Sequence, residues 1–308
     1  MQRILVVYNP RSSRFKDVRA DILDVLNNPT RMQEMSLNGI LVGKYEVEKT
    51  NVDDNAAKLA KLIRDGDVVL AVGGDATAVI VANGILLSKK DAALAALPYG
   101  NFNDLAKMLK VKTLTDVFKA KTAKLWPLEV LVDGKHLRYS TCYTTIGMMA
   151  EATELFDNKK VRKSLRKGHK SSWRSYPKLA RWYFNNRSKR VFLPEFKLNG
   201  LLQKKNTTDY LAVNGKKLAR VMRGGEWHKD ARTFWHTTGR LKSFFRLSMF
   251  MAKSMLKRVP GEETKGDKLE FLVPATVEFQ SEGEYKILEN IEKIEIKKAE
   301  QFLKVLYL

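Results

Sequence analysis

Apolar residues in the first third of the chain come in short blocks that amphipathic stretches separate. The apolar blocks predict buried strands at residues 3–8, 45–49, 67–72 and 92–97. The other stretches predict helices at residues 17–26, 53–63, 77–87 and 103–109, with Asp53 or Asp54 capping the second helix and Gly66 stopping it. Strands that alternate with helices indicate a parallel sheet with helices on both faces.

Beyond about residue 124 the predicted elements no longer alternate between strand and helix and are mainly strands. Apolar blocks at 128–132 and 136–143 flank Asp133-Gly134, which is typical of a β-hairpin. Further strands are predicted at residues 191–198, 210–213, 269–273, 276–279 and 291–296. We therefore expect an α/β domain with a parallel sheet over residues 1–125 and a β-rich domain of antiparallel character over residues 126–308. The last strand is a candidate to pack back on the first domain.

The composition is that of a globular protein with two domains. Of the 308 residues, 44% are hydrophobic, which is enough for a sizeable core. No apolar run reaches the roughly 18 residues that a membrane-spanning helix needs, and the start does not resemble a secretory signal. Cys142 is the only cysteine, so an intramolecular disulfide is impossible and a cytoplasmic location is expected.

The formal net charge of +22 indicates an anionic partner. Residues 158–190 hold thirteen Lys or Arg and no acid, with aromatic residues between them. This segment favours an acidic membrane surface or a solvated basic loop, and we do not expect nucleic acid as a partner. Residues 241–258 form a basic amphipathic pattern whose apolar stripe is more typical of core packing than of membrane binding.

The loops that follow the predicted strands contain most of the residues that could bind a ligand or a metal. They contain Asn9-Pro10-Arg11-Ser12-Ser13, then Thr50, then Gly73-Gly74-Asp75-Ala76-Thr77, then Pro98 to Asp104 with Gly100, Asn101 and Asn103. In an open parallel sheet these loops share one edge, where ligands bind. Glycines let the backbone approach a phosphate, and helix N-termini present free N–H groups. The pattern predicts phosphate binding, with Asp75 and Asp104 as candidate magnesium ligands.

These motifs resemble the catalytic domain of the diacylglycerol kinase family, whose superfamily includes sphingosine and ceramide kinases and bacterial lipid kinases. The resemblance rests on Gly73-Gly74-Asp75-Ala76-Thr77, Asn83-Gly84 and Pro98-Tyr99-Gly100-Asn101-Phe102-Asn103-Asp104-Leu105-Ala106 at the family's spacing. The opening Tyr8-Asn9-Pro10, with Ser12 and Ser13, looks like its first nucleotide loop. In the second half, Thr145–Met148, Val213-Asn214 and Ser281-Glu282-Gly283-Glu284 look like further landmarks.

The resemblance implies ATP, magnesium and transfer of a phosphoryl group to a lipid hydroxyl by a peripherally membrane-associated enzyme. It also implies that residues 1–125 form a Rossmann-like three-layer α/β domain and that residues 126–308 form a β-sandwich domain. It places nucleotide binding at residues 9, 10, 12, 13, 50, 73–75, 77, 100, 101, 103 and 104, the metal at Asp75 and Asp104, and catalysis at Asp75, Glu282 and Glu284. Glu284 is the expected base, with Glu282 in support. Two carboxylates that flank a glycine turn can face one cleft and push their pKa values apart. The other interpretation is a solvated hairpin turn.

The chain departs from the family pattern at Ala76, Val79, Ile80 and Asn101. These departures motivate an alternative, a weakened or inactive lipid- or membrane-binding protein on a kinase scaffold. A nicotinamide-dinucleotide kinase shares the Gly-Gly-Asp loop, but the loop from Pro98 to Ala106 resembles the lipid branch. A homodimer remains an open option.

Overall fold

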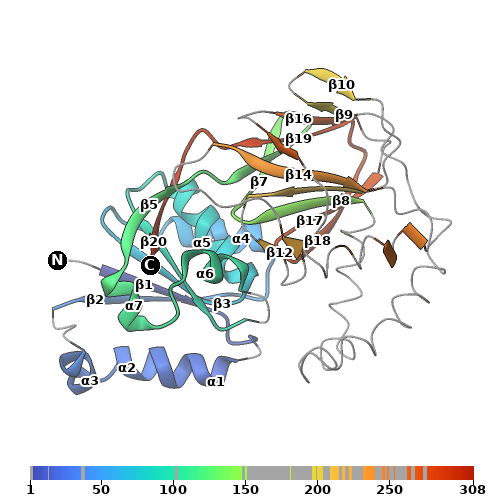
Figure 1. The fold of residues 1–308 in the computed structure, drawn as a ribbon. Helices are drawn as coiled ribbons and strands as arrows, with labels where there is room; N and C mark the ends of the chain where they lie inside the picture. Colours follow the sequence, from blue (N-terminus) through green and yellow to red (C-terminus); the bar gives the residue numbers. More distant parts are fainter. Residues whose placement is uncertain are drawn as a thin grey trace.

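The computed structural model describes residues 3–12, 14–35, 39–100, 103–147 and 276–308, together with short segments between residues 150 and 272. The described strands form three six-stranded sheets and one two-stranded ribbon, in which β12 (Lys217–Leu218) pairs with β13 (Met222–Arg223). In Figure 1, one sheet and its helices lie beside a sandwich of the other two.

The first sheet, sheet A, has the strand order β2-β1-β3-β4-β20-β5. Its strands are β1 (Arg3–Tyr8), β2 (Leu41–Glu46), β3 (Val68–Gly73), β4 (Ala93–Pro98), β5 (Lys121–Leu125) and β20 (Leu303–Tyr307). All neighbours are parallel except β5, which runs antiparallel to β20. The C-terminal strand therefore does pack into the first sheet, as expected. Strand β3 is buried over its whole length, which explains its unbroken apolar sequence.

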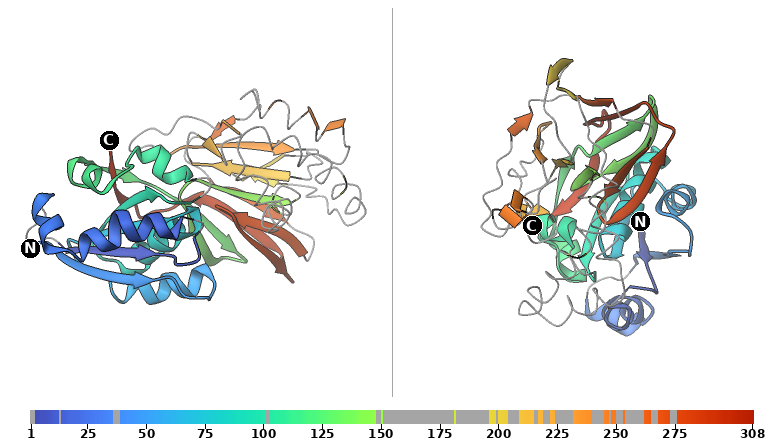
Figure 2. Two further views of the ribbon diagram at one scale, coloured as in Figure 1. Left: turned by 90° about the horizontal axis from the view of Figure 1, so that it is seen from below. Right: turned by 90° about the vertical axis from the view of Figure 1, so that its right-hand side faces the viewer.

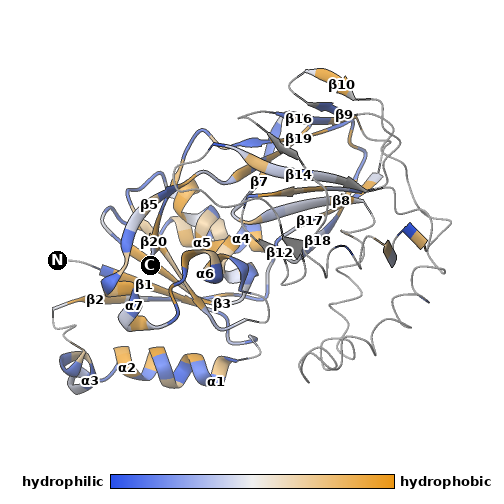
Figure 3. Cartoon of the chain, viewed as in Figure 1, coloured by the Kyte–Doolittle hydropathy of each residue, from blue (hydrophilic) through white to orange (hydrophobic). Residues whose placement is uncertain are grey.

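Helices cover both faces of sheet A. They are α1 (Phe15–Val18), α2 (Asp24–Leu26), α3 (Pro29–Glu34), α4 (Val52–Ala60), α5 (Asp75–Ser88), α6 (Asp104–Leu109) and α7 (Leu114–Lys119), with a π-helical segment, Arg19–Leu23, joining α1 to α2. In Figure 1, α1 to α3 lie on one side of the sheet, and α4 and α5 lie on the other. Helix α5 is apolar nearly throughout because almost all its residues are buried, whereas α1 and α2 mix polar and apolar residues (Figure 3).

Two local expectations were wrong. The cap of α4 is Asn51, whose Oδ1 accepts from the Asp54 N–H at 2.7 Å, and the helix ends at Ala60 rather than near residue 63. The single strand expected at residues 136–143 is two strands, because the chain leaves one sheet at Ser140 and enters another at Tyr143. Helices α3 and α7 were not predicted, because six residues are too short for a periodic signal.

The other two sheets are antiparallel and share one core. Sheet B contains β10 (Leu201–Gln203), β9 (Phe196–Leu198), β16 (Leu269–Leu272), β19 (Lys293–Lys298), β6 (Leu128–Val132) and β7 (Lys135–Ser140). Sheet C contains β15 (Glu262–Thr264), β14 (Phe234–Gly239), β11 (Asp209–Val213), β8 (Tyr143–Gly147), β17 (Thr276–Ser281) and β18 (Glu284–Glu289). Phe271 of sheet B and Tyr210 and Phe279 of sheet C pack in a single buried cluster. Figure 2 shows this sandwich beside sheet A.

Side chains from α4 and α5 hold the edge strand β7 of the sandwich. The Asn83 amide donates to Tyr139 O and accepts from Tyr139 N–H, both at 2.9 Å, and so completes the edge as a neighbouring strand would. Arg138, only 5% exposed, makes two bonds to Asp53 at 2.9 and 3.0 Å. A Cβ on Gly84 would lie 3.0 Å from Leu59, so this glycine lets α4 and α5 pack closely. The Asn-Gly motif is therefore structural.

The basic segment at residues 158–190 lies outside the described residues except for Arg181. Most of residues 241–258 also lie outside them. Of the few described there, Phe245 is 70% exposed, so this side chain does not pack in the core as expected. No helix in the described part of the chain is long and apolar enough to cross a membrane.

Candidate active site

The loops after β3 and β4 touch through their backbones. A Cβ added to Gly100 would lie 2.2 Å from the Gly74 Cα, and one added to Gly73 would lie 2.4 Å from the Thr77 hydroxyl oxygen. No side chain fits at Gly73 or Gly100, because these contacts are far inside van der Waals distance. The two glycine motifs therefore form one continuous surface at the carboxyl edge of sheet A.

Asp75 joins these two loops. It is the first residue of α5, and its carboxylate accepts from the backbone N–H groups of Asn103 at 3.0 Å and Asp104 at 2.6 Å. Asn103 adopts a left-handed conformation with φ +56°, and its amide bonds to the N–H and C=O of Gly100 at 2.7 and 2.8 Å. Burial raises the pKa of Asp75, and the two N–H groups partly offset this effect.

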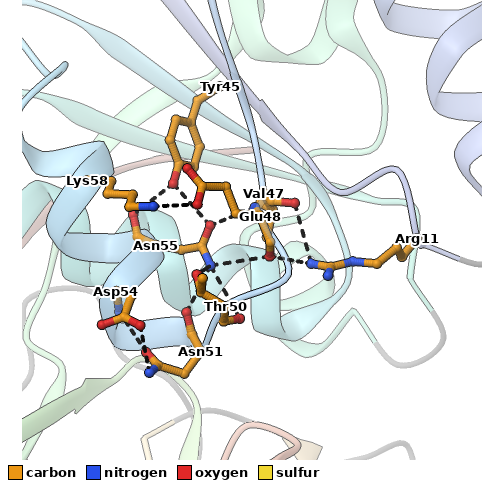
Figure 4. A network of polar contacts seen from close by, with 9 residues as sticks. All are labelled: Arg11, Tyr45, Val47, Glu48, Thr50, Asn51, Asp54, Asn55 and Lys58. Carbon is orange, nitrogen blue, oxygen red and sulfur yellow. Dashed lines mark hydrogen bonds and ion pairs between the residues drawn. The ribbon is translucent and has the colours of Figure 1, made fainter.

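The loops after β1 and β2 are tied together by a polar network (Figure 4). Arg11 donates to the carbonyls of Val47 and Glu48, at 3.4 and 2.5 Å, and to the Asn9 side chain at 3.3 Å. At the centre lies Asn55, which is fully buried and bonds to the Tyr45 hydroxyl and the Glu48 N–H. The network holds the second loop against the first.

Thr50 and Ser12 present hydroxyl groups at this edge. Thr50 is exposed, and its oxygen accepts from Asn55 Nδ2 at 2.8 Å, which leaves its hydrogen available to a ligand. The Ser12 oxygen is buried and has no partner in the described part of the chain. The nearby Pro10 is partly exposed. Ser13 and Asn101, which the motifs also place here, lie outside the described residues.

A two-residue turn between β17 and β18 carries the acidic pair Glu282 and Glu284. Its central residues both have positive φ, +49° at Glu282 and +91° at Gly283, as a type I′ turn requires. Glu282 is only 2% exposed. Glu284, the first residue of β18, is partly exposed and pairs with Ser281. The two carboxylates therefore lie in different environments.

The segment between β7 and β8 surrounds the Glu282 carboxylate. Its oxygens lie 2.5 Å from Cys142 N, 2.9 Å from the Thr141 hydroxyl and 3.0 Å from the Ser140 hydroxyl. Ser140 Oγ also lies 2.5 Å from the Tyr143 carbonyl, so the carbonyl and the Glu282 carboxylate compete for its one hydroxyl hydrogen. Burial, above all, raises the pKa of Glu282 to about 7.

Three acidic side chains come together around Cys142 and Tyr143. Burial and the charges of Asp75, Asp104 and Glu282 raise the pKa values of both the Cys142 thiol and the Tyr143 phenol. Tyr143 accepts from Gln280 Nε2 at 3.1 Å, so a second polar side chain from sheet C lies beside it. The fold thus brings the Asp75 loop and the Glu282 turn to one place. Cys142 is buried and unsuited to act as a nucleophile, as expected.

Asp75 and Asp104 fit a magnesium ion of the kind that nucleotide phosphates also ligate. The described residues contain no cluster of three acidic, His or Cys side chains spaced for a metal. Magnesium, however, needs only one or two carboxylates when substrate phosphates supply other ligands. Each Asp75 oxygen makes one bond to a backbone N–H and keeps a further lone pair. The carboxyl groups of Asp75 and Asp104 are therefore the pair that suits a cation.

The departures from the family pattern do not strain the described loop. Ala76 lies in the first turn of α5 and is not among the residues with positive φ, so its β-carbon fits the backbone. Val79 and Ile80 are buried in the core beneath sheet A. These positions therefore serve packing in this chain.

Sequence reasoning missed the residues that hold the site together. Asn55, Thr141 and Asn214 each make several hydrogen bonds from buried positions, yet none belongs to a motif with an assigned role. A polar residue inside an apolar block was the available signal, because a buried amide must find partners.

Comparison with known proteins matches residues 3–137 to the family model of the diacylglycerol kinase catalytic domain. A diacylglycerol kinase of Bacillus subtilis (strain 168) is 31% identical over 122 residues, which cover 39% of this chain and 37% of that protein. A diacylglycerol kinase of Staphylococcus saprophyticus is 29% identical over 140 residues, covering 44% and 39%. The chain thus spans less than half the length of the curated relatives it matches.

A solved structure of a diacylglycerol kinase from Bacillus anthracis strain Sterne resembles the whole chain. The TM-score is 0.62 at 12% sequence identity, and the alignment covers 100% of this chain and 97% of the other. The two proteins share an α/β sheet followed by antiparallel sheets, well beyond the part that sequence comparison matches.

Proposed function

We propose that this protein, whose residues 3–137 belong to the diacylglycerol kinase catalytic-domain family, transfers the γ-phosphoryl group of ATP to the hydroxyl of a diacylglycerol-like lipid at a membrane surface. One observation carries the proposal. Asp75 bridges the two glycine loops, and its charge contributes to the raised pKa of the buried Glu282 in the opposite sheet. Phosphoryl transfer depends mainly on such positioning and charge stabilisation.

The nucleotide occupies the edge of sheet A in this proposal. Gly74 and Gly100 carry no side chains that would keep phosphates from the loop backbone, and Thr50 and Ser12 offer hydroxyl groups. Asp75 and Asp104 would hold magnesium together with phosphate oxygens. The metal neutralises charge on the phosphates when bound. Burial raises the pKa of Asp75, and a bound cation would favour its charged form.

Glu284 is the proposed base, and Glu282 anchors the turn that carries it. Glu282 is held on both oxygens and is almost inaccessible, so it cannot approach a lipid hydroxyl. Glu284 is partly exposed two residues later. The lipid hydroxyl oxygen forms a bond to the γ-phosphorus as the bond to the ADP oxygen breaks, and the hydroxyl proton passes to the Glu284 carboxylate.

The test is ATP consumption and lipid phosphorylation over anionic liposomes that contain diacylglycerol, with magnesium. We expect turnover that requires both the lipid and the metal, and that is lost in Glu284→Gln and Asp75→Asn. Glu289→Gln is the matched control, because Glu289 is an exposed acid on the same strand. Firm liposome binding without turnover in the unmodified protein would instead favour the inactive-scaffold alternative.

A further inference from the structure

A lysine that belongs to no motif lies where the chain crosses between sheet A and the sandwich. Lys298 is the last residue of β19, and its Nζ donates to the Trp126 carbonyl at 3.0 Å and to Asn214 Oδ1. Trp126 belongs to the link from β5 to β6, and the chain after Lys298 leads back to β20. Ala299 N–H donates to Pro127 O at 2.9 Å, so the two crossings run side by side.

Asn214 continues the connection toward the candidate active site. Its Nδ2 donates to Trp126 O at 2.8 Å and to Thr141 O at 3.0 Å, and its N–H donates to Cys142 O at 2.6 Å. Thr141 and Cys142 are the residues that hold the Glu282 carboxylate through the Thr141 hydroxyl and the Cys142 N–H. An unbroken series of hydrogen bonds therefore runs from Lys298 to the turn that carries Glu284.

The surroundings of Lys298 are neutral. In the described part of the chain its amine contacts oxygens of a carbonyl and an amide, and no carboxylate. Burial lowers the pKa of Lys298 to about 7. A neutral amine keeps two N–H groups, which is the number that Trp126 and Asn214 require. Both contacts therefore survive loss of the proton, and the connection persists on both sides of neutral pH.

We propose that Lys298 is a positioning residue for the phosphoryl transfer: it ties the interdomain crossings to Asn214 and, through Thr141, sets the place of Glu282 and the turn that carries the base. This inference rests on the proposed function for its kinetic consequence. Its structural consequence, the ordering of residues 140–142 by Lys298, can be measured whether or not the protein is a kinase.

The test compares Lys298→Met with Lys297→Met in the full-length protein. Methionine keeps the length of the side chain and removes both donors. Lys297 is the matched control, because it is the neighbouring lysine and pairs on the surface with Glu129 at 3.4 Å and Glu300 at 3.9 Å. The readouts are hydrogen exchange at the Cys142 amide, and kcat and KM for ATP in the liposome assay.

We expect exchange at Cys142 to rise about tenfold or more in Lys298→Met and to stay unchanged in Lys297→Met. We expect kcat to fall about tenfold with KM for ATP changed less than about twofold, because the base moves while the nucleotide loops do not. A general loss of stability would raise exchange throughout the sandwich, whereas loss of positioning raises it at residues 140–142 and 214 first.

Unchanged exchange at Cys142 in a folded Lys298→Met protein would overturn the proposal. If that variant does not fold, Lys298→Gln, which keeps one N–H₂ donor on a shorter side chain, is compared in the same exchange experiment. Faster exchange at Cys142 in Lys298→Gln supports the proposal, and unchanged exchange overturns it. If the unmodified protein has no kinase activity, the proposed function fails, and the exchange experiment still tests the role of Lys298.

Discussion

Two β-hairpin turns in the described part of the chain have the same backbone conformation, Asp133-Gly134 between β6 and β7 and Glu282-Gly283 between β17 and β18. In both, the two central residues have positive φ, +48° and +78° in the first and +49° and +91° in the second. Asp-Gly is a favoured sequence for this turn because aspartate tolerates the left-handed region. Glutamate lacks that advantage, so the second turn is locally the less favourable one.

The carboxylates of Asp133 and Glu282 in these two turns make different contacts. Asp133 Oδ1 accepts from the backbone N–H groups of Glu292 and Lys293 at 3.0 and 2.8 Å, which ties together neighbouring strands of one sheet. Glu282 reaches across to the link between β7 and β8, where three successive residues contact its carboxylate. The longer side chain spans that gap. A turn residue that local geometry disfavours therefore points to a function beyond the turn.

The largest expected difference between the two turns concerns the residue that follows the turn glycine, which is Lys135 in the first turn and Glu284 in the second. We predict that Glu284→Gln lowers kcat by about 10²–10⁴-fold, because a general base contributes about that much. The equivalent change after the first turn, Lys135→Gln, leaves kcat unchanged. Lipid phosphorylation kinetics with both variants measure the difference. Normal turnover in Glu284→Gln would remove this residue as the base.

The second difference is the dependence of stability on pH. Because the folded-state pKa of Glu282 is raised to about 7, above an unfolded value of about 4.3, the folded state binds the extra proton between these values. Stability from this group is present below about pH 4.3 and is lost as pH rises to about 7, by about 4 kcal/mol in all. Urea unfolding of Glu282→Gln should show a flatter profile over this range, whereas Asp133→Asn should follow the unmodified protein.

A third, smaller difference concerns the same two variants at neutral pH. Glu282→Gln places an amide N–H₂ at one of the two oxygen positions, and the Thr141 hydroxyl contacts both positions, so we expect a cost of about 1–3 kcal/mol for mismatched donors. Asp133→Asn should cost about 0.5 kcal/mol or less, because asparagine suits the turn and keeps the carbonyl acceptor. If urea unfolding shows equal losses of stability in the two variants, the buried contacts of Glu282 contribute no more to stability than the surface contacts of Asp133.

The smallest expected difference concerns the glycine that both turns contain. Gly134 and Gly283 both have positive φ, and a Cβ at either would meet nothing within 4 Å. Alanine at each position should therefore cost a similar amount, about 1–2 kcal/mol, from the left-handed backbone alone. If Gly283→Ala lost much more stability than Gly134→Ala in thermal unfolding, crowding at the active site would be the cause.

The sequence predicted β1, β3 and β4 of sheet A and the loops that follow them, because continuous apolar blocks and glycine motifs are local signals, whereas β5 and the bounds of β20 were not predicted and β2 begins four residues before the expected strand. The family match over residues 3–137 confirms the resemblance that those motifs indicated. Burial of Glu282 beside Cys142, and with it the different environments of Glu282 and Glu284, could not be predicted from the sequence of the turn. The division into domains at residue 125 stays a prediction.

The amino-acid sequence by itself determined which backbone positions need glycine, where the apolar strands lie and which acids accompany the loops. Only the tertiary structure decided which of these polar groups meet. Asn83 meets the edge of β7, and Lys298 meets Asn214, over separations of 56 and 84 residues along the chain. The physical reason is that a buried polar group is stable only with a partner, and the partner's identity depends on how the sheets pack rather than on its neighbours in sequence.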